Sequence, residues 1–511
     1  MFRQKLQDLW PLLLFPALKA GIHLATSTGY GTFRDEFYYV ACSRRLAFGY
    51  VDHPALSIAL LRGTLEVLGE SLWAIRLVPT LAGALAVFVV GLLARRMGGG
   101  AVAQCLAMAS ALVVPGYLAL HHFYSMNALD ILFWAVTALL VIELAENEGD
   151  LRRWALLGVV LGLGLHNKIS ILWLSLGLGV GILLTDIRRT LKTPGPWLAG
   201  GLAFLLFLPH LLWQVHNGWP TLEFIANATG QKMVEVQPLE FLAGQFFFLG
   251  GPAVAGLALL GLGALFMWPA LARFRWLAWI YVTVFVVLAA SGTSRAGYLA
   301  PAYTWLLAAG AVALERFLPP PPKRGWLLAL VFGLLATQGA LLAPLGLPLL
   351  PVDGYIAHAQ RLGIAPSTAE RKELAELPQF FADMHGWPEK VAGAQEAVRS
   401  LSPQEQEEAC VFAYNYGVAG ALEVLGGEHM PPVVSGHNNY YLWGPGNCTG
   451  EVLVIMGGTA EGHRRLFASV EEVTRVDCGY CMPYENHQGV FVARGLQGDL
   501  EQVWQELKHY D

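Results

Sequence analysis

The sequence predicts a polytopic α-helical membrane protein with a smaller soluble α/β domain at its C-terminal end. The 511 residues are 55% hydrophobic and only 14% charged, with a mean hydropathy of +0.48, whereas soluble domains carry about 25% charged residues. Long apolar stretches recur up to about residue 350, and shorter apolar runs follow in residues 352–511. The net charge of −5 gives no indication of a nucleic-acid partner.

A helix needs about 20 apolar residues to cross a bilayer, and the sequence predicts about 11 such helices. The expected spans are residues 9–28, 73–94, 101–119, 128–145, 154–167, 169–185, 197–213, 240–268, 276–291, 297–315 and 326–350. The first stretch, Leu9 to Thr28, has no small-residue cleavage site, so we expect a retained span rather than a signal peptide.

Basic residues in alternate connections predict the orientation in the membrane. Lys and Arg favour cytoplasmic loops, and the residues concerned are Arg3, Lys5, Arg95, Arg96, Arg152, Arg153, Arg188, Arg189, Lys192, Arg273, Arg275, Lys323 and Arg324. The N-terminus is therefore expected on the cytoplasmic side of the membrane, which in a bacterium is the plasma (inner) membrane. The loops at 29–72, 120–127, 166–168, 214–239 and 292–296 are expected outside, together with the C-terminal part.

The division into domains is expected at residue 352, with a transmembrane domain over 1–351 and a periplasmic or extracytoplasmic α/β domain over 352–511. Alternating strands and helices indicate this second fold class. The expected strands are Cys410–Ala413, Val433–Val434, Val452–Met456 and Val490–Ala493. The expected helices include Glu461–Glu472 and Leu500–His509.

Four cysteines in this C-terminal part, Cys410, Cys448, Cys478 and Cys481, are candidates for disulfides. An oxidising compartment would favour such bonds. Free thiols are the alternative, and the pair Cys478-Gly-Tyr-Cys481 could also bind a metal or do redox work.

The first outer loop carries the acidic pair Asp35-Glu36 and, further on, Asp52-His53-Pro54. An acid pair at the membrane surface could act as a general base towards a hydroxyl or an amine, or hold a divalent cation. The plainer interpretation is an acidic pair at a helix start, and Asp52 could likewise lie beside a helix N-cap. Several aromatic residues suit helices in the plane of the interface, namely Phe37, Tyr38, Tyr39, Phe48 and Tyr50.

Further ionisable residues lie in or beside the other outer loops. Asp130 falls just inside a predicted span, where a charge is costly and is a functional candidate, although a helix-dipole role is also open. His121 and His122 could ligate a metal or form interfacial hydrogen bonds. Lys168 lies on the outer side, where a lysine is disfavoured. It could hold a lipid phosphate or extend to the interface. Arg295 is a second basic residue on the outer side that could hold a phosphate, and its planar guanidinium presents its N–H donors in a more rigid geometry.

These motifs resemble the membrane-embedded GT-C glycosyltransferases of the PMT-2 or family-39 type, which include protein O-mannosyltransferases and aminoarabinose transferases. The resemblance covers roughly residues 20–315. It is carried by Asp35-Glu36 with Tyr50-Val-Asp52-His53-Pro54, by Asp130 with Gly-Leu-His-Asn-Lys168, by Arg295 with Tyr298 and Pro301, and by Pro209 to Thr221. The C-terminal part is similar to periplasmic domains of bacterial members.

The resemblance implies a polyprenyl-phosphate-linked sugar as donor and a lipid, glycan or protein acceptor on the outer face. Asp35, Glu36 and Asp130 would form the catalytic set, with Asp35 as base and inversion at the anomeric carbon. Lys168, Arg295 and Tyr298 would bind the donor phosphate. Substrate contacts are expected from Tyr38, Asp52, His53 and His122. Some relatives use a divalent metal, for which Asp35, Glu36 and His121 are candidate ligands.

Two other classes of protein remain open from the sequence. A secondary transporter would be expected to show inverted repeats, and no internal symmetry is evident. A membrane-anchored sensor would not explain the outward acids and Lys168. The aromatic run Asn439–Trp443 could stack on sugar rings, or it could be a strand and turn in the core of the C-terminal domain.

Overall fold

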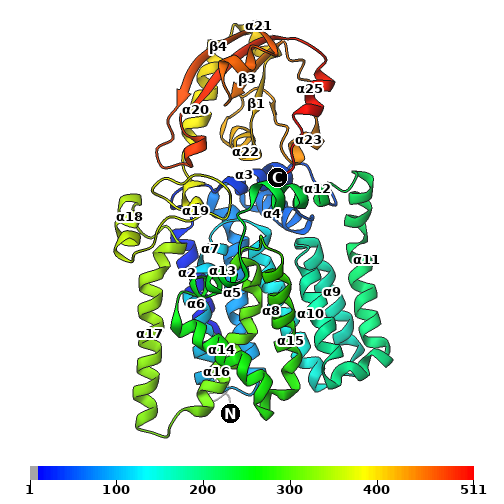
Figure 1. Ribbon diagram of the computed structural model, residues 1–511, viewed down its shortest axis with the longest axis vertical. Coiled ribbons are helices and arrows are strands. Elements are labelled where there is room, and N and C mark those ends of the chain that lie inside the picture. Colours follow the sequence, from blue (N-terminus) through cyan, green and yellow to red (C-terminus); the bar gives the residue numbers. More distant parts are fainter. Residues whose placement is uncertain (1–9) are drawn as a thin grey trace.

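The computed structural model describes residues 10–511. A bundle of long helices carries a small sheet domain at one end, and the C-terminus lies at the junction between the two (Figure 1). Arg3, Lys5 and Leu9, which belong to the predicted first loop and span, lie outside the described residues.

Helices from α2 to α17 build the bundle. Their bounds are α2 Trp10–Thr26, α5 Leu72–Arg96, α6 Ala101–Val113, α7 Pro115–Leu120, α8 Met126–Glu146, α9 Leu151–Asn167, α10 Ile171–Leu183, η1 Asp186–Lys192, α11 Pro194–His216, α12 Pro220–Asn227, η2 Ala228–Lys232, α13 Pro238–Leu249, α14 Pro252–Met267, η3 Pro269–Phe274, α15 Arg275–Ala290, η4 Ala296–Ala302, α16 Tyr303–Phe317 and α17 Lys323–Gly346. Two further helices, α3 Arg34–Ser43 and α4 Leu56–Leu68, lie between the bundle and the sheet (Figure 1).

Six helical stretches within residues 10–511 are long and apolar enough to cross a membrane, or up to eight if each of two bent pairs counts as one span. The chain is therefore a multi-pass membrane protein, but the expected count of about 11 helices is not confirmed. The stretch at 240–268 is bent by 113° between α13 and α14. Gly250 and Gly251 both have positive φ there, a conformation that glycine adopts without strain.

The helices pack through small residues, as is typical of membrane bundles. Gly261 on α14 faces Gly310 on α16, and a Cβ at either position would collide with the backbone of the other helix. The closest approach of these two helices therefore depends on glycine.

The helix α3 is buried between the bundle and the sheet domain instead of having one face free to contact lipid. Phe37, Tyr38 and Tyr39 are at most 4% exposed, and they belong to a core shared with α22 and α20 of the sheet domain. Gly420 on α22 packs against the Phe37 backbone so closely that a Cβ would collide with it. The aromatic residues of the first outer loop thus join the bundle to the sheet domain, and of those expected at the interface only Phe48 is well exposed.

The sheet has five strands in the order β2-β1-β3-β5-β4. The first three are parallel, and β5 pairs antiparallel with β3 and β4. Strand bounds are β1 Cys410–Ala413, β2 Val433–Val434, β3 Val452–Met456, β4 Phe467–Val476 and β5 Gln488–Leu496. The remaining helices of the chain are α18 Val352–Arg361, α19 Gln379–Ala382, α20 Trp387–Ser400, α21 Pro403–Glu408, α22 Tyr416–Leu425, α23 Asn439–Trp443, α24 Ala460–His463, η5 Pro483–Glu485 and α25 Leu500–Glu506. Of these, α18 lies beside the end of α17 and away from the sheet (Figure 1).

Candidate active site

The two acids of the first outer loop have different surroundings. Glu36 is completely buried, and Arg76 on α5 donates to both of its oxygens at 2.9 and 2.8 Å. The backbone N–H groups of Phe33 and Tyr124 donate to the same carboxylate at 2.8 and 2.9 Å. These four donors occupy the lone pairs that a carboxylate directs in its plane. Because Arg76 belongs to α5, Glu36 connects the first outer loop to the bundle. This differs from the expectation that Glu36 could be a metal ligand.

Asp35 is the accessible member of the pair, with a side chain that is 32% exposed. The Tyr416 hydroxyl donates to its Oδ1 at 2.9 Å, and the Arg34 guanidinium lies 3.6 Å away. His437 packs against the Tyr416 ring at 4.7 Å between centroids. Asp35 is therefore oriented by the sheet domain while one side of its carboxylate stays open for a substrate group.

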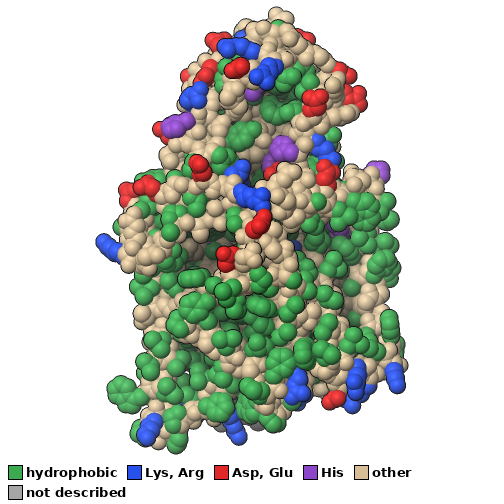
Figure 2. Space-filling view, viewed as in Figure 1, with side chains coloured by type: hydrophobic (Ala, Val, Ile, Leu, Met, Phe, Trp, Pro, Cys, Tyr) green, Lys and Arg blue, Asp and Glu red, His purple; other side chains and the backbone are tan. Residues whose placement is uncertain are grey.

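A cluster of charges surrounds Asp35 at the junction, where Figure 2 shows acidic and basic side chains between the sheet domain and the bundle. Arg34 reaches Glu370 at 3.7 Å and Asp383 at 3.5 Å. Arg295 reaches the same Glu370 oxygen at 3.4 Å, and Lys232 lies 3.9 Å from it. Glu370 thus connects Arg34, next to Asp35 in the chain, with the predicted phosphate residue Arg295.

The buried acids of this cluster have shifted pKa values. Burial alone would raise the pKa of Glu370, but Arg34, Lys232 and Arg295 outweigh it and lower the pKa to about 2. Burial raises the pKa of Asp383 to about 7, because Arg34 only partly offsets the burial and the nearby Glu485 and Glu370 add to the shift. Glu370 is therefore a fixed anion, whereas Asp383 changes its charge near neutral pH.

Asp383→Asn is expected to raise the free energy of unfolding relative to the wild type, and to raise it more at pH 8 than at pH 5. The carboxyl ionises near 3.8 in the unfolded chain and near 7 in the folded one, so the folded protein binds the proton more tightly between these values. The free energy of unfolding therefore falls as the pH rises through this window, and an asparagine removes that loss. Thermal unfolding at both pH values measures the effect. The exposed Asp353→Asn is the control. The prediction is contradicted if the unfolding temperatures of Asp383→Asn and the wild type differ by the same amount at both pH values.

Lys168 follows the last residue of α9, and its ammonium donates to the Asn127 side chain at 2.8 Å. It lies 3.5 Å from Asp130 Oδ2, and its Nζ is 5.2 Å from the centre of the Tyr298 ring. The Ser170 hydroxyl also contacts both oxygens of Asp130. The structure therefore brings together Asp130, Lys168 and Tyr298, and it places Asp130 where it orients Lys168.

The residues expected to contact substrate are mostly enclosed. Tyr38, His53 and His122 are each 1% exposed. Tyr38 donates to Asp52 at 3.0 Å, and the ring of His53 stacks on Tyr39 with 4.7 Å between centroids. Burial raises the pKa of Asp52 above its usual 3.8. The expectation of substrate contact therefore does not fit Tyr38, His53 and His122, because packing against neighbouring residues leaves them almost no free surface.

The predicted metal ligands do not converge. His121 is buried, with Nδ1 2.6 Å from the Tyr117 carbonyl oxygen, and its ring lies 6.3 Å from that of His23. Within residues 10–511 the only group of three ligand side chains close enough to hold a metal is His437, His509 and Asp511. His437 Nδ1 there accepts from the Tyr416 backbone N–H, which leaves Nε2 to donate to Asp511 at 3.2 Å. This contact links His437 to the C-terminal Asp511.

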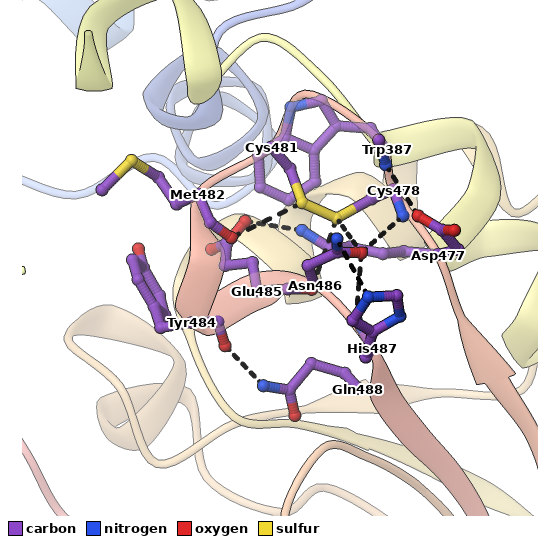
Figure 3. The surroundings of a disulfide bond; sticks show 12 residues. Trp387, Asp477, Cys478, Cys481, Met482, Tyr484, Glu485, Asn486, His487 and Gln488 are labelled. Atoms are coloured by element: carbon purple, nitrogen blue, oxygen red, sulfur yellow. Dashed lines mark hydrogen bonds and ion pairs between the residues drawn. A yellow bond between two sulfur atoms is a disulfide. The ribbon is translucent and has the colours of Figure 1, made fainter. Parts of the chain in front are cut away.

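The four C-terminal cysteines form two disulfides, Cys410–Cys448 and Cys478–Cys481. The second lies at the start of a turn that continues through Tyr484 and Glu485 (Figure 3). The Tyr484 hydroxyl accepts from Arg34 at 3.1 Å, and Glu485 pairs with Lys390 at 2.5 Å. The disulfide therefore closes a turn that helps to hold Arg34 beside Asp35.

Comparisons with known proteins agree with this architecture. Residues 52–213 match the PMT-2 family, described as dolichyl-phosphate-mannose-protein mannosyltransferase. No protein with a curated description matches the sequence. The matched region contains Asp52, Asp130 and Lys168, whereas Asp35 and Arg295 lie outside it.

Solved structures extend the likeness to the whole fold. ArnT from Cupriavidus metallidurans bound to undecaprenyl phosphate gives a TM-score of 0.61 at 16% identity, over 94% of this chain and 97% of ArnT. Arabinofuranosyltransferase AftD from Mycobacteria gives a TM-score of 0.52 at 16% identity, over 96% of this chain and 42% of AftD. AglB from Archaeoglobus fulgidus, in complex with an inhibitory peptide and a dolichol-phosphate, gives a TM-score of 0.51 at 12% identity. The match covers 84% of this chain and 65% of AglB. The predicted resemblance is confirmed: the chain has the GT-C fold, and its residues 52–213 carry the signature of the PMT-2 family.

Proposed function

We propose that this chain is a membrane glycosyltransferase that moves a sugar from a polyprenyl-phosphate-linked donor to an acceptor on the side of the bilayer where the sheet domain lies. The observation that carries the proposal is the continuous set of charges from Asp35 through Arg34 and Glu370 to Arg295. The family match and the fold shared with ArnT, whose structure holds undecaprenyl phosphate, support this class of donor.

Asp35 acts as the general base in this proposal. It takes the proton of the acceptor hydroxyl or amine while that atom forms a bond to the anomeric carbon of the sugar. The bond between this carbon and the phosphate oxygen breaks at the same time, and its electron pair leaves with the polyprenyl phosphate. Attack opposite to the leaving phosphate inverts the anomeric configuration.

Arg295 and Lys168 stabilise the phosphate charge as it develops. Arg295 Nε is buried and has no hydrogen-bond partner among the described residues. A phosphate oxygen would satisfy it. Asp130, which accepts from the Ser170 hydroxyl, holds Lys168 in position together with Asn127, so Asp130 is a positioning residue rather than a base.

The side of the membrane follows from the same proposal. Lys and Arg side chains gather at the end of the bundle farthest from the sheet domain (Figure 2), which favours a cytoplasmic location for that end. The sheet domain and Asp35 would then lie outside the plasma membrane of a bacterium, where a cell-envelope lipid, glycan or protein is the acceptor.

Arg295→Ala is expected to raise the KM for the polyprenyl-phosphate sugar by roughly 10- to 100-fold, because a hydrogen bond to a charged group contributes about 1.5–3 kcal/mol. Lys168→Ala should act in the same direction. Neither change should raise the KM for the acceptor. Initial rates of transfer by the full chain in lipid nanodiscs, at varied donor and acceptor, measure both constants.

The control for this experiment is Arg371→Ala. Arg371 is exposed, follows Glu370 in the chain and pairs with Glu235 outside the cluster. Its loss should leave the KM for the donor unchanged. A selective rise in the KM for the acceptor in Arg295→Ala would contradict the phosphate role.

A further inference from the structure

A cleft of about 560 Å³ opens between the end of α3 and the sheet domain. Arg44 and Arg45 line it from the first outer loop, Glu423 from α22, and Tyr440 and Trp443 from α23. Asp35 and its charge cluster do not line this cleft. The proposed transfer reaction therefore leaves it without a role.

The cleft combines an aromatic wall with charged groups that are already paired. The Tyr440 and Trp443 rings meet edge to face at 4.8 Å, and the Arg45 guanidinium lies 4.4 Å from the centre of the Trp443 ring. Glu423 accepts from Arg45 at 2.8 and 3.0 Å, and Glu70 accepts from Arg44 at 2.6 Å. Each positive charge thus has a carboxylate partner, so the site does not favour an anion.

We propose that this cleft binds a neutral sugar residue of a glycan. One face of a pyranose ring is largely C–H and packs on an aromatic ring, while its hydroxyls need donors and acceptors held in fixed directions. Trp443 is only half-buried and supplies the aromatic surface. The Arg45–Glu423 pair beside it supplies both donors and acceptors. A concave site with an apolar wall and a few fixed polar groups is the usual form of a small-molecule site.

The position of the cleft suggests what this glycan does. The helix α3 has 10 residues, with Asp35 near its first residue and Arg44 just after its last. At a rise of 1.5 Å per residue the two ends are roughly 15 Å apart. A bound sugar would therefore lie several ring lengths from the base, as a distal residue of an oligosaccharide acceptor would. This last step rests on the proposed function, whereas the binding of the sugar does not.

Binding can be tested without any transfer reaction. The full chain in lipid nanodiscs, free of glycoside detergents, is titrated with neutral hexasaccharides of glucose, mannose and xylose in a calorimeter. We expect saturable binding of at least one of them. Trp443→Leu should weaken it roughly tenfold, as expected for the loss of an aromatic packing partner, while Trp443→Phe should stay within about threefold of the wild type because the aromatic surface remains.

Two further variants make the outcome decisive. Trp326→Leu changes a tryptophan that is 82% exposed on α17 and should bind as the wild type does, and so should Asp35→Asn. The proposal is overturned if no hexasaccharide binds, or if Trp443→Leu binds like the wild type while its thermal unfolding shows an intact fold. If Asp35→Asn kept full transfer activity, only the proposed function would fail. If transfer depended on Asp35 but no sugar bound, only the proposed binding of sugar in the cleft would fail.

Discussion

Asp35→Asn is expected to lower kcat for sugar transfer by roughly 10²- to 10⁴-fold, the range that a positioned general base contributes. An asparagine cannot take the acceptor proton, but its carbonyl oxygen can still accept from the Tyr416 hydroxyl, which lies 2.9 Å from Asp35 Oδ1. The surrounding geometry should therefore persist. Release of polyprenyl phosphate by the full chain in nanodiscs, followed over time with a labelled donor, measures the loss.

Binding of the donor separates this role from a general disruption of the site. Asp35→Asn should bind polyprenyl phosphate like the wild type, because Arg295 and Lys168 remain in place. The control is Glu66→Gln, an exposed change on α4 in a pair with Arg62, and it should keep full activity. Turnover by Asp35→Asn at the wild-type rate would remove Asp35 as the base. The absence of turnover in the wild type with any polyprenyl-linked sugar would favour a transporter or a sensor.

Three strands of the C-terminal domain were predictable because short apolar runs mark them. The predictions for Cys410–Ala413, Val433–Val434 and Val452–Met456 agree with β1, β2 and β3 residue for residue. These strands lie in the parallel part of the sheet, where burial on both faces selects continuous apolar runs over alternating ones. Local composition and tertiary structure therefore favour the same conformation.

The prediction of a helix at Glu461–Glu472 was wrong beyond its first turn. Only Ala460–His463 is helical, and Phe467–Val476 forms the edge strand β4. Its charged residues Glu471 and Glu472 face solvent, so the segment lacks the apolar content of a central strand. Pairing with β5 determines its conformation, and a partner strand outside the segment is not visible in the composition of the segment itself. The run Asn439–Trp443, considered as a possible strand and turn, is likewise a short helix.

Residues of the candidate site were predictable only where the residue type is unusual in the surrounding sequence. Lys168 stands out as a lysine in apolar sequence, and Asp130 as an acid inside a span, and the structure places the two 3.5 Å apart. Glu370 and Asp383 lie in a polar connection where acids are common, so their sequence gives no indication of a site. Arg34 directly precedes Asp35 in the sequence. Its role depends on contacts with Glu370 and Asp383 that only the folded chain creates.

The pair Asp35-Glu36 shows why neighbouring acids need not share a role. Successive residues on a helix point about 100° apart, so Asp35 faces the sheet domain while Glu36 points into the bundle towards Arg76. The sequence identifies the pair but not the buried arginine, which lies 40 positions further along the chain. The structure therefore separates a candidate base from an anchor.

Glu36→Gln is expected to destabilise the fold by about 3–5 kcal/mol, the usual effect of leaving one partner of a buried ion pair without the other. Arg76 is 1% exposed. Besides Glu36, its hydrogen-bond partners among the described residues are the Ser27 and Gly31 carbonyl oxygens and the His122 ring. An amide in place of the carboxylate removes the compensating charge and turns an N–H₂ group towards donors. The apparent temperature of unfolding in nanodiscs, at a fixed heating rate, measures the loss.

Glu66→Gln is the matched control for this change as well, since Glu66 also pairs with an arginine, Arg62, at 2.6 Å but on the surface. An exposed pair four residues apart on a helix contributes only about 0.3–0.5 kcal/mol, so this variant should unfold close to the wild-type temperature. Replacing both partners, Glu36→Gln with Arg76→Met, should cost less than the sum of the two single changes, because no charge is then left buried alone. Equal unfolding temperatures for Glu36→Gln and Glu66→Gln would show that the buried pair does not anchor the loop, and the position of Asp35 would then need another support.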